Sequence, residues 1–175
     1  MKRFRGFTIT ELMAVLVIAA VLLGIGIPGF RHLIHNQKIT VTANDFLAAV
    51  HLTRSEAIQR GARIDLVPAG DGTDWARGWV VLIDRNANQK ADGGDQVIYT
   101  HGPAPDGISI AAAFTDSKVQ YLAYNGTGRT RTNANSQASQ MGAWRFSIDK
   151  QERKIVVNFL GRPRLCNPQT DPATC

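Results

Sequence analysis

The sequence predicts an α+β protein in which a long N-terminal helix packs on a C-terminal antiparallel β-sandwich. Three observations lead to this prediction. An apolar run covers residues 12–27. Apolar residues then recur every three or four positions as far as Ile58, as on one face of a helix. After Arg63, short segments rich in β-branched and aromatic residues alternate with turn-forming residues, which is typical of antiparallel strands.

The apolar run is long enough to cross a membrane. From Phe7 to Pro28 there are 22 residues, which span about 33 Å as a helix. Three basic residues stand within the first six positions, so this end is expected to stay cytoplasmic and the bulk of the chain to lie on the far side. One carboxylate, Glu11, stands at the mouth of the run, where a charge in low dielectric requires a cation nearby.

Three interpretations compete for this segment. It could be a secretory signal peptide cut near Gly24-Ile25-Gly26, a plain single-span anchor, or a prepilin signal. Gly6-Phe7-Thr8-Ile9-Thr10-Glu11-Leu12-Met13 resembles the type IV prepilin signal, which typically reads G-F-[ST]-L-[IL]-E-[LM]. We favour this third interpretation, although Thr10 stands where that signal usually has an aliphatic residue. The resemblance implies cleavage between Gly6 and Phe7, N-methylation of Phe7 and retention of the helix.

The resemblance also assigns roles in assembly. After cleavage, the new amino group of Phe7 would lie one helical turn from Glu11 and could pair with its carboxylate. In a filament, the amino group of a neighbouring chain could pair with Glu11 instead and would then set the axial register of the subunit in the fibre. Pro28 is expected to kink the helix without ending it. The implied partners are a prepilin peptidase, other pilins or pseudopilins and the bacterial inner membrane. The chain would cross that membrane once, with its C-terminal domain periplasmic or in an extracellular pilus.

The helix is expected to continue beyond Pro28 as an amphipathic segment and to stop at Gly61. The expected segments are a cleaved leader (1–6), a transmembrane and assembly helix (7–30), an amphipathic continuation (31–62), a β domain (63–165) and a tail (166–175). The apolar stripe that should dock on the sheets comprises Ala43, Phe46, Leu47, Val50, Arg54, Ala57 and Ile58.

Seven short segments are expected to be strands, and the polar stretch 130–142 is expected to be a mobile loop. The expected strands are Ile64–Val67, Trp79–Ile83, Val97–Tyr99, Ile108–Phe114, Val119–Tyr124, Trp144–Ile148 and Ile155–Leu160.

Three further phrases carry a family resemblance. Residues 53–58 (TRSEAI), 78–86 (GWVVLIDRN) and 126–129 (GTGR) resemble the GspH/FimT branch of pseudopilins. Together with the N-terminal signal, the resemblance covers nearly the whole chain. It implies a pilin-like fold and a minor pilin or pseudopilin that serves as an assembly subunit and not as an enzyme.

Charge is distributed unevenly along the chain. The formal net charge is +6, of which the leader contributes +3. Residues 65–117 carry eight Asp against three basic residues, net −5, whereas residues 118–165 carry nine basic residues against two acidic ones, net +7. This asymmetry predicts one basic face.

The two cysteines, Cys166 and Cys175, both stand in the polar C-terminal tail. A tail outside the cytoplasm lies where disulfides persist, so we expect the two to be joined. They form no CxxC motif and no zinc spacing.

The segment Gly161-Arg162-Pro163-Arg164 follows the last expected strand. Its two guanidiniums flank a proline that fixes the backbone, and arginine binds phosphate through paired hydrogen bonds. The segment resembles the GRxR tail motif of FimT proteins, minor pilins linked to DNA uptake in natural transformation. The alternative is a solvated basic tail, but the net charge of +7 favours double-stranded DNA. Candidate supporting phosphate contacts are Arg129, Arg131, Arg145, Lys150, Arg153 and Lys154.

Other constellations carry less weight. The stretch Asp84–Asp95 imitates a calcium loop, but Gln89 stands where the sharp turn needs Gly, so a hairpin loop with self-made Asp and Asn turns is favoured. Asn125-Gly126-Thr127 fits a glycosylation sequon and, as we prefer, a turn at a strand end. The four histidines come with no HExxH motif and no nucleophile elbow, and we expect no cofactor, no metal and no catalytic residue.

The favoured function is therefore a minor subunit of a type IV pilus that binds extracellular DNA. The alternative is a minor pseudopilin of a type II secretion system that contacts tip subunits or cargo.

Overall fold

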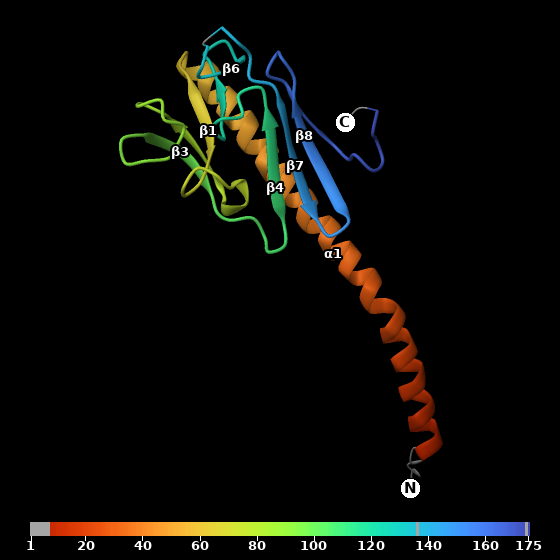
Figure 1. Ribbon diagram of the computed structural model, residues 1–175. Coiled ribbons are helices and arrows are strands. Elements are labelled where there is room, and N and C mark those ends of the chain that lie inside the picture. The colour runs from red at the N-terminus through yellow and green to blue at the C-terminus, as the bar shows by residue number, and fades with distance from the viewer. Residues whose placement is uncertain (1–7, 136, 174) are drawn as a thin grey trace. The chain divides into compact units, whose positions relative to one another are not determined.

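The computed structural model describes residues 8–135, 137–173 and 175. Helix α1 spans Ile9–Arg60, and the described residues form two compact units, one up to Gln37 and one from Lys38 onward. The second unit holds a short 3-10 turn, η1 (Trp75–Arg77), and nine strands (Figure 1). The strands are β1 (Ile64–Pro68), β2 (Trp79–Ile83), β3 (Gln96–His101), β4 (Ser109–Phe114), β5 (Leu122–Tyr124), β6 (Thr130–Arg131), β7 (Gly142–Ile148), β8 (Gln151–Val157) and β9 (Pro163–Cys166).

Both ends of α1 are capped by identifiable residues. At the start, the Thr8 amide donates to the Glu11 carboxylate at 3.0 Å and the Glu11 amide donates to the Thr8 hydroxyl at 3.3 Å, which is a capping box. At the other end, Gly61 takes a φ of 61°, and the Ala62 amide donates to the carbonyl of Ala57 at 3.2 Å. This is a Schellman motif. The predicted stop at Gly61 is thus confirmed, and α1 runs through position 28 without ending there.

The first half of α1 leaves large apolar side chains exposed. Ile9, Leu16 and Leu23 are between 60% and 79% exposed. In the part of the chain that the structure describes, no helical segment combines the length and the apolarity that crossing a membrane requires.

The second half of α1 supplies the centre of the core. Phe46 lies 4.8 Å from the ring of Trp79 on β2 and 4.7 Å from the ring of Trp144 on β7, measured between centroids. The helix therefore packs against both sheets (Figure 1). Most of the predicted stripe is buried as expected, whereas Ile58, which we placed in the stripe, is 51% exposed.

The strands form two antiparallel sheets. Sheet A has the order β3-β2-β1-β5-β6, and sheet B has the order β4-β7-β8-β9. The predicted α+β architecture of a long helix on antiparallel sheets is confirmed, and β2 has the predicted bounds.

Four expected strands match β1, β3, β4 and β7 to within two residues at each end, and three expectations differ from the structure by more than that or in the number of strands. The segment expected at 155–160 is β8, which begins at Gln151 and ends at Val157, and β9 follows it as a further strand. The stretch expected as a loop from position 130 opens with β6. The strand expected from Val119 begins only at Leu122.

Candidate nucleic-acid interface

The predicted DNA-binding arginines lie on an ordered hairpin and not in a loose tail. Residues 158–162 connect β8 to β9, and the Asn158 side-chain oxygen accepts a hydrogen bond from the Arg162 amide at 3.0 Å. Arg164 lies on β9 opposite Val156 of β8. Both arginine side chains are exposed, and among the described residues neither guanidinium has a hydrogen-bond or ion-pair partner.

Gly161 fixes this hairpin against the rest of the domain. Its φ is +75°, and a Cβ at this position would lie only 3.0 Å from the ring of Tyr124 on β5. The Gly161 carbonyl accepts a buried hydrogen bond from the Tyr124 hydroxyl at 2.8 Å. Arg54 of α1 donates to the same carbonyl at 3.4 Å, which gives the arginine of the TRSEAI phrase a structural role.

A disulfide holds the end of β9. Cys166 and Cys175 are joined, as predicted. Cys166 stands opposite Lys154 of β8, and the Lys154 ammonium donates to the backbone oxygen of Cys175 at 2.8 Å. The tail is therefore tied to sheet B at two points.

The supporting cations do not share one face. Because side chains alternate along a strand, Lys154 lies on the outer face of sheet B with Arg145, its partner in register, while Arg153 lies on the inner face opposite Phe146. Arg153 donates to the hydroxyl of Thr40 on α1 at 3.2 Å. Of the candidate supporting contacts, Arg153 therefore lies on the opposite face of sheet B from Arg145 and Lys154.

The remaining cations differ in how available they are. Arg131 is half-buried and donates to the carbonyl of Thr130 at 2.9 Å, so its guanidinium is already engaged and we do not retain it among the candidate phosphate contacts. Arg145 is exposed, and Glu152 lies 3.8 Å away. Arg129 and Lys150 are exposed at the β5–β6 and β7–β8 turns.

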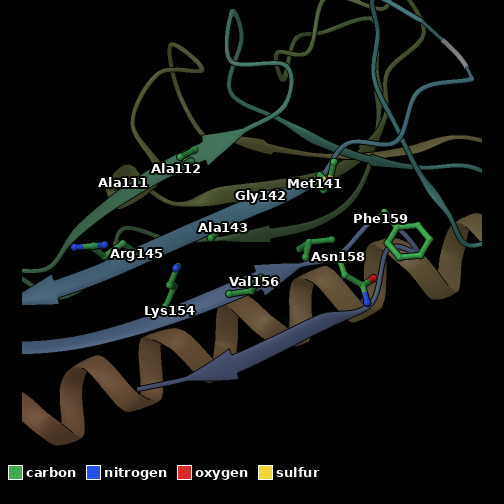
Figure 2. A pocket seen from close by; sticks show the side chains of 12 residues that line it. Ala111, Ala112, Met141, Gly142, Ala143, Arg145, Lys154, Val156, Asn158 and Phe159 are labelled. Atoms are coloured by element: carbon green, nitrogen blue, oxygen red, sulfur yellow. The ribbon is translucent and has the colours of Figure 1, made fainter. Parts of the chain in front are cut away.

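A shallow groove of about 660 Å³ lies on the outer face of sheet B. Small apolar residues, among them Ala111, Ala143 and Val156, form much of its lining. Figure 2 shows Arg145 and Lys154 at one end and Met141 and Phe159 at the other. Phe159 is 60% exposed, so its ring is accessible at that end of the groove. The groove is not evident from the sequence, because it depends on which residues share a face of the sheet.

The carboxylates of the loop 84–95 accept hydrogen bonds from donors within the same loop. Asp84 accepts from the Gln89 amide at 2.8 Å, and Asp92 accepts from the Asn88 side chain at 2.8 Å. The hydrogen bond from the Gly94 amide holds the pKa of Asp92 below its usual range. Gln89 adopts a φ of 59°, the left-handed conformation that the sharp turn requires. Among the described residues, no group of three or more His, Cys, Asp or Glu could hold a metal ion.

Comparison with known proteins identifies the family. The model of the family described as type II transport protein GspH matches residues 42–161. The chain belongs to the GspH family. A second family model, the prokaryotic N-terminal methylation motif, matches residues 1–27. The predicted membership of the GspH/FimT branch is thus confirmed.

Individual proteins similar to this GspH-family chain include a pilin-like relative and solved structures of the same fold. It is 34% identical over 99 residues to the pilin-like protein PilA1 of Thermus thermophilus, a match that covers 55% of this chain and 59% of that protein. The chain thus spans about three fifths of the length of this relative. Two crystal structures of the type IV minor pilin FimU of Pseudomonas aeruginosa share its fold, with TM-scores of 0.61 and 0.58 at 15% identity. The first match covers 77% of this chain and 92% of the FimU chain, and the second covers 75% of this chain and 94% of the FimU chain.

Proposed function

We propose that this GspH-family protein is a minor, non-catalytic subunit of a type IV pilus that binds double-stranded DNA through Arg162 and Arg164. In this proposal the chain is cut between Gly6 and Phe7, which lie outside the described residues. The N-terminal methylation motif supports the cleavage. Sequencing the N-terminus of the membrane-extracted protein tests it, because a mature chain that begins near Ile27 would indicate a signal peptide instead.

The first half of α1 would anchor the subunit in the bacterial inner membrane and then join other pilins. Its exposed apolar side chains need an apolar environment, which lipid and neighbouring helices both provide. Glu11 would serve as the assembly residue there. Its capping-box bonds to Thr8 keep the carboxylate at the helix start, within reach of an incoming amino group.

The observation that supports DNA as the ligand is that two neighbouring arginines are exposed and lack an acidic partner among the described residues. Arg162 and Arg164 are exposed on an anchored hairpin and edge strand, without an acidic partner among the described residues. Because the backbone that carries them is ordered, little backbone entropy is lost when they bind phosphate. Neither lies on a helix that could enter a DNA groove, so the contacts would be to phosphates and largely independent of base sequence.

The test is a charge-matched pair of double variants of the full chain in a neutral detergent. Arg162→Gln with Arg164→Gln should weaken binding to duplex DNA by about tenfold or more, and should reduce the slope of log Kobs against log salt by about 2. The control, Arg77→Gln with Arg85→Gln, removes the same charge from exposed positions in the acidic half of the domain and should leave affinity nearly unchanged. Equal losses in both variants, or no binding by the parent at low salt, would refute the DNA proposal.

The second candidate is the minor pseudopilin of a type II secretion system, favoured by the groove on sheet B. An apolar floor with Met141 and Phe159 at one end suits a segment of a neighbouring pilin-like subunit. Ala113→Gln would narrow this groove. If that change blocked assembly of a secretion complex and the parent bound no DNA, the second candidate would replace the first.

A further inference from the structure

Two hairpin loops of the chain share one sequence pattern. Residues 125–129 (NGTGR) connect β5 to β6, and residues 158–162 (NFLGR) connect β8 to β9. Each loop has five residues between the last paired residues of its strands. The pattern in both is Asn-x-x-Gly-Arg, and the two loops belong to different sheets.

The two loops also share one hydrogen-bond pattern. In each, the glycine amide donates to the asparagine carbonyl at 2.8 Å. The asparagine side-chain oxygen accepts from the arginine amide, at 3.1 Å for Arg129 and 3.0 Å for Arg162. The glycines, Gly128 and Gly161, take φ values of 71° and 75°. Arg129 and Arg162 therefore leave the backbone at equivalent points of two equivalent loops.

The loops lie against each other. A Cβ at Gly161 would be 3.1 Å from the amide nitrogen of Thr130 and 3.3 Å from the carbonyl oxygen of Gly128. Standard backbone dimensions then place the Cα atoms of Arg129 and Arg162 within about 11 Å of each other. Both side chains are exposed, and within the described part of the chain neither guanidinium has a hydrogen-bond or ion-pair partner.

We propose that the two hairpins form one site for the phosphates of a nucleic-acid backbone, in which Arg129 is an equal partner of Arg162. This inference rests on the proposed function and extends it to the second sheet. Two guanidiniums that have no partner among the described residues, carried on adjacent loops with ordered backbones, bind an anionic nucleic-acid chain with little loss of protein backbone entropy. The hydroxyl of Tyr124 on β5 bonds the Gly161 carbonyl, so the two loops keep a fixed spacing.

Arg131 provides a matched control on the same strand end. It stands two residues after Arg129 and carries the same charge, but it is half-buried and its guanidinium donates to the carbonyl of Thr130. A general loss of positive charge would therefore affect Arg129→Gln and Arg131→Gln equally. A specific site would respond only to Arg129→Gln.

The experiment measures duplex DNA binding by the full chain in a neutral detergent across a series of salt concentrations. Arg129→Gln and Arg162→Gln should each weaken affinity by a similar factor and lower the slope of log Kobs against log salt by about 1. Arg131→Gln should leave the slope at the parent value.

The possible outcomes separate this inference from the proposed function. If Arg162→Gln weakens binding while Arg129→Gln does not, or if Arg129→Gln and Arg131→Gln act alike, the two-hairpin site is wrong and the role of Arg162 stands. If the parent shows no salt-dependent binding, the proposed function itself fails. If each variant unfolds at the same midpoint temperature as the parent protein, the losses of DNA affinity are not due to misfolding.

Discussion

The two sheets of the domain differ in how far the face that points away from α1 is buried. The central strands of sheet A, β1, β2 and β5, are buried on both faces: α1 packs on one, and a second cluster that includes Val80, Leu82 and Tyr121 buries the other. Sheet B packs its inner face on α1 and leaves its outer face as a groove with Arg145 and Lys154 at one end, and Arg164 is exposed on its edge strand β9. A charge on the central strands of sheet A must therefore be matched within the fold, whereas Arg164 on the edge strand β9 of sheet B is available to a partner.

Asp65 of β1 shows what matching within the fold means. Its side chain is buried, and it accepts from the Arg63 guanidinium at 2.7 Å. Burial raises the pKa of Asp65, and the hydrogen bonds and charge of Arg63 oppose that rise. This pair is a structural element of sheet A and has no part in the proposed interface.

Breaking this pair is the strongest test of the contrast. Arg63→Leu should lower the free energy of unfolding by about 3–5 kcal/mol, because it leaves Asp65 buried without its cation. Since the folded-state pKa of Asp65 lies above its unfolded value, the deficit should be small below the unfolded pKa and should grow as pH rises through the folded pKa. Urea unfolding at pH 4 and pH 7 measures both effects. Adding Asp65→Asn should recover part of the loss, and no recovery would mean that the buried charge is not the cause.

A smaller effect is expected at the contact between the sheets. Gly161→Ala places a Cβ at positive φ and 3.0 Å from the Tyr124 ring, so we expect a loss of about 1–3 kcal/mol and weaker DNA binding. Gly93→Ala is the control, because that position has open space around it and no positive φ. Chemical denaturation and DNA titration of both variants measure the two effects. If the Gly161→Ala protein were as stable as the parent, the hairpin would not be held as tightly as its contacts indicate.

The sequence was sufficient to predict what depends on local pattern. The helix, its stop at Gly61 and strand β2 follow from hydrophobic periodicity and turn chemistry. The Thr8–Glu11 capping box and the repeated Asn-x-x-Gly-Arg loops are also readable in the sequence, although Glu11 was interpreted as a membrane and assembly residue and not as part of a helix cap.

Strand β9 and the faces of sheet B could not be predicted in this way. Residues 163–166 have little strand propensity, yet they pair with β8 as an edge strand, and Pro163 opens it, where a missing amide is tolerated. The separation of Arg153 from Lys154 depends on register, because neighbouring side chains on a strand point to opposite faces. Composition alone showed a basic segment and could not divide it between two faces.

The most direct test of the central claim is a residue-by-residue map of the DNA contact. In a titration of the isotopically labelled full chain with duplex DNA, followed by NMR in a neutral detergent, we predict amide shifts concentrated in residues 125–131 and 158–166. The acidic loop, residues 84–95, should remain unchanged. Shifts centred on that loop, or none at saturating DNA and low salt, would contradict the account.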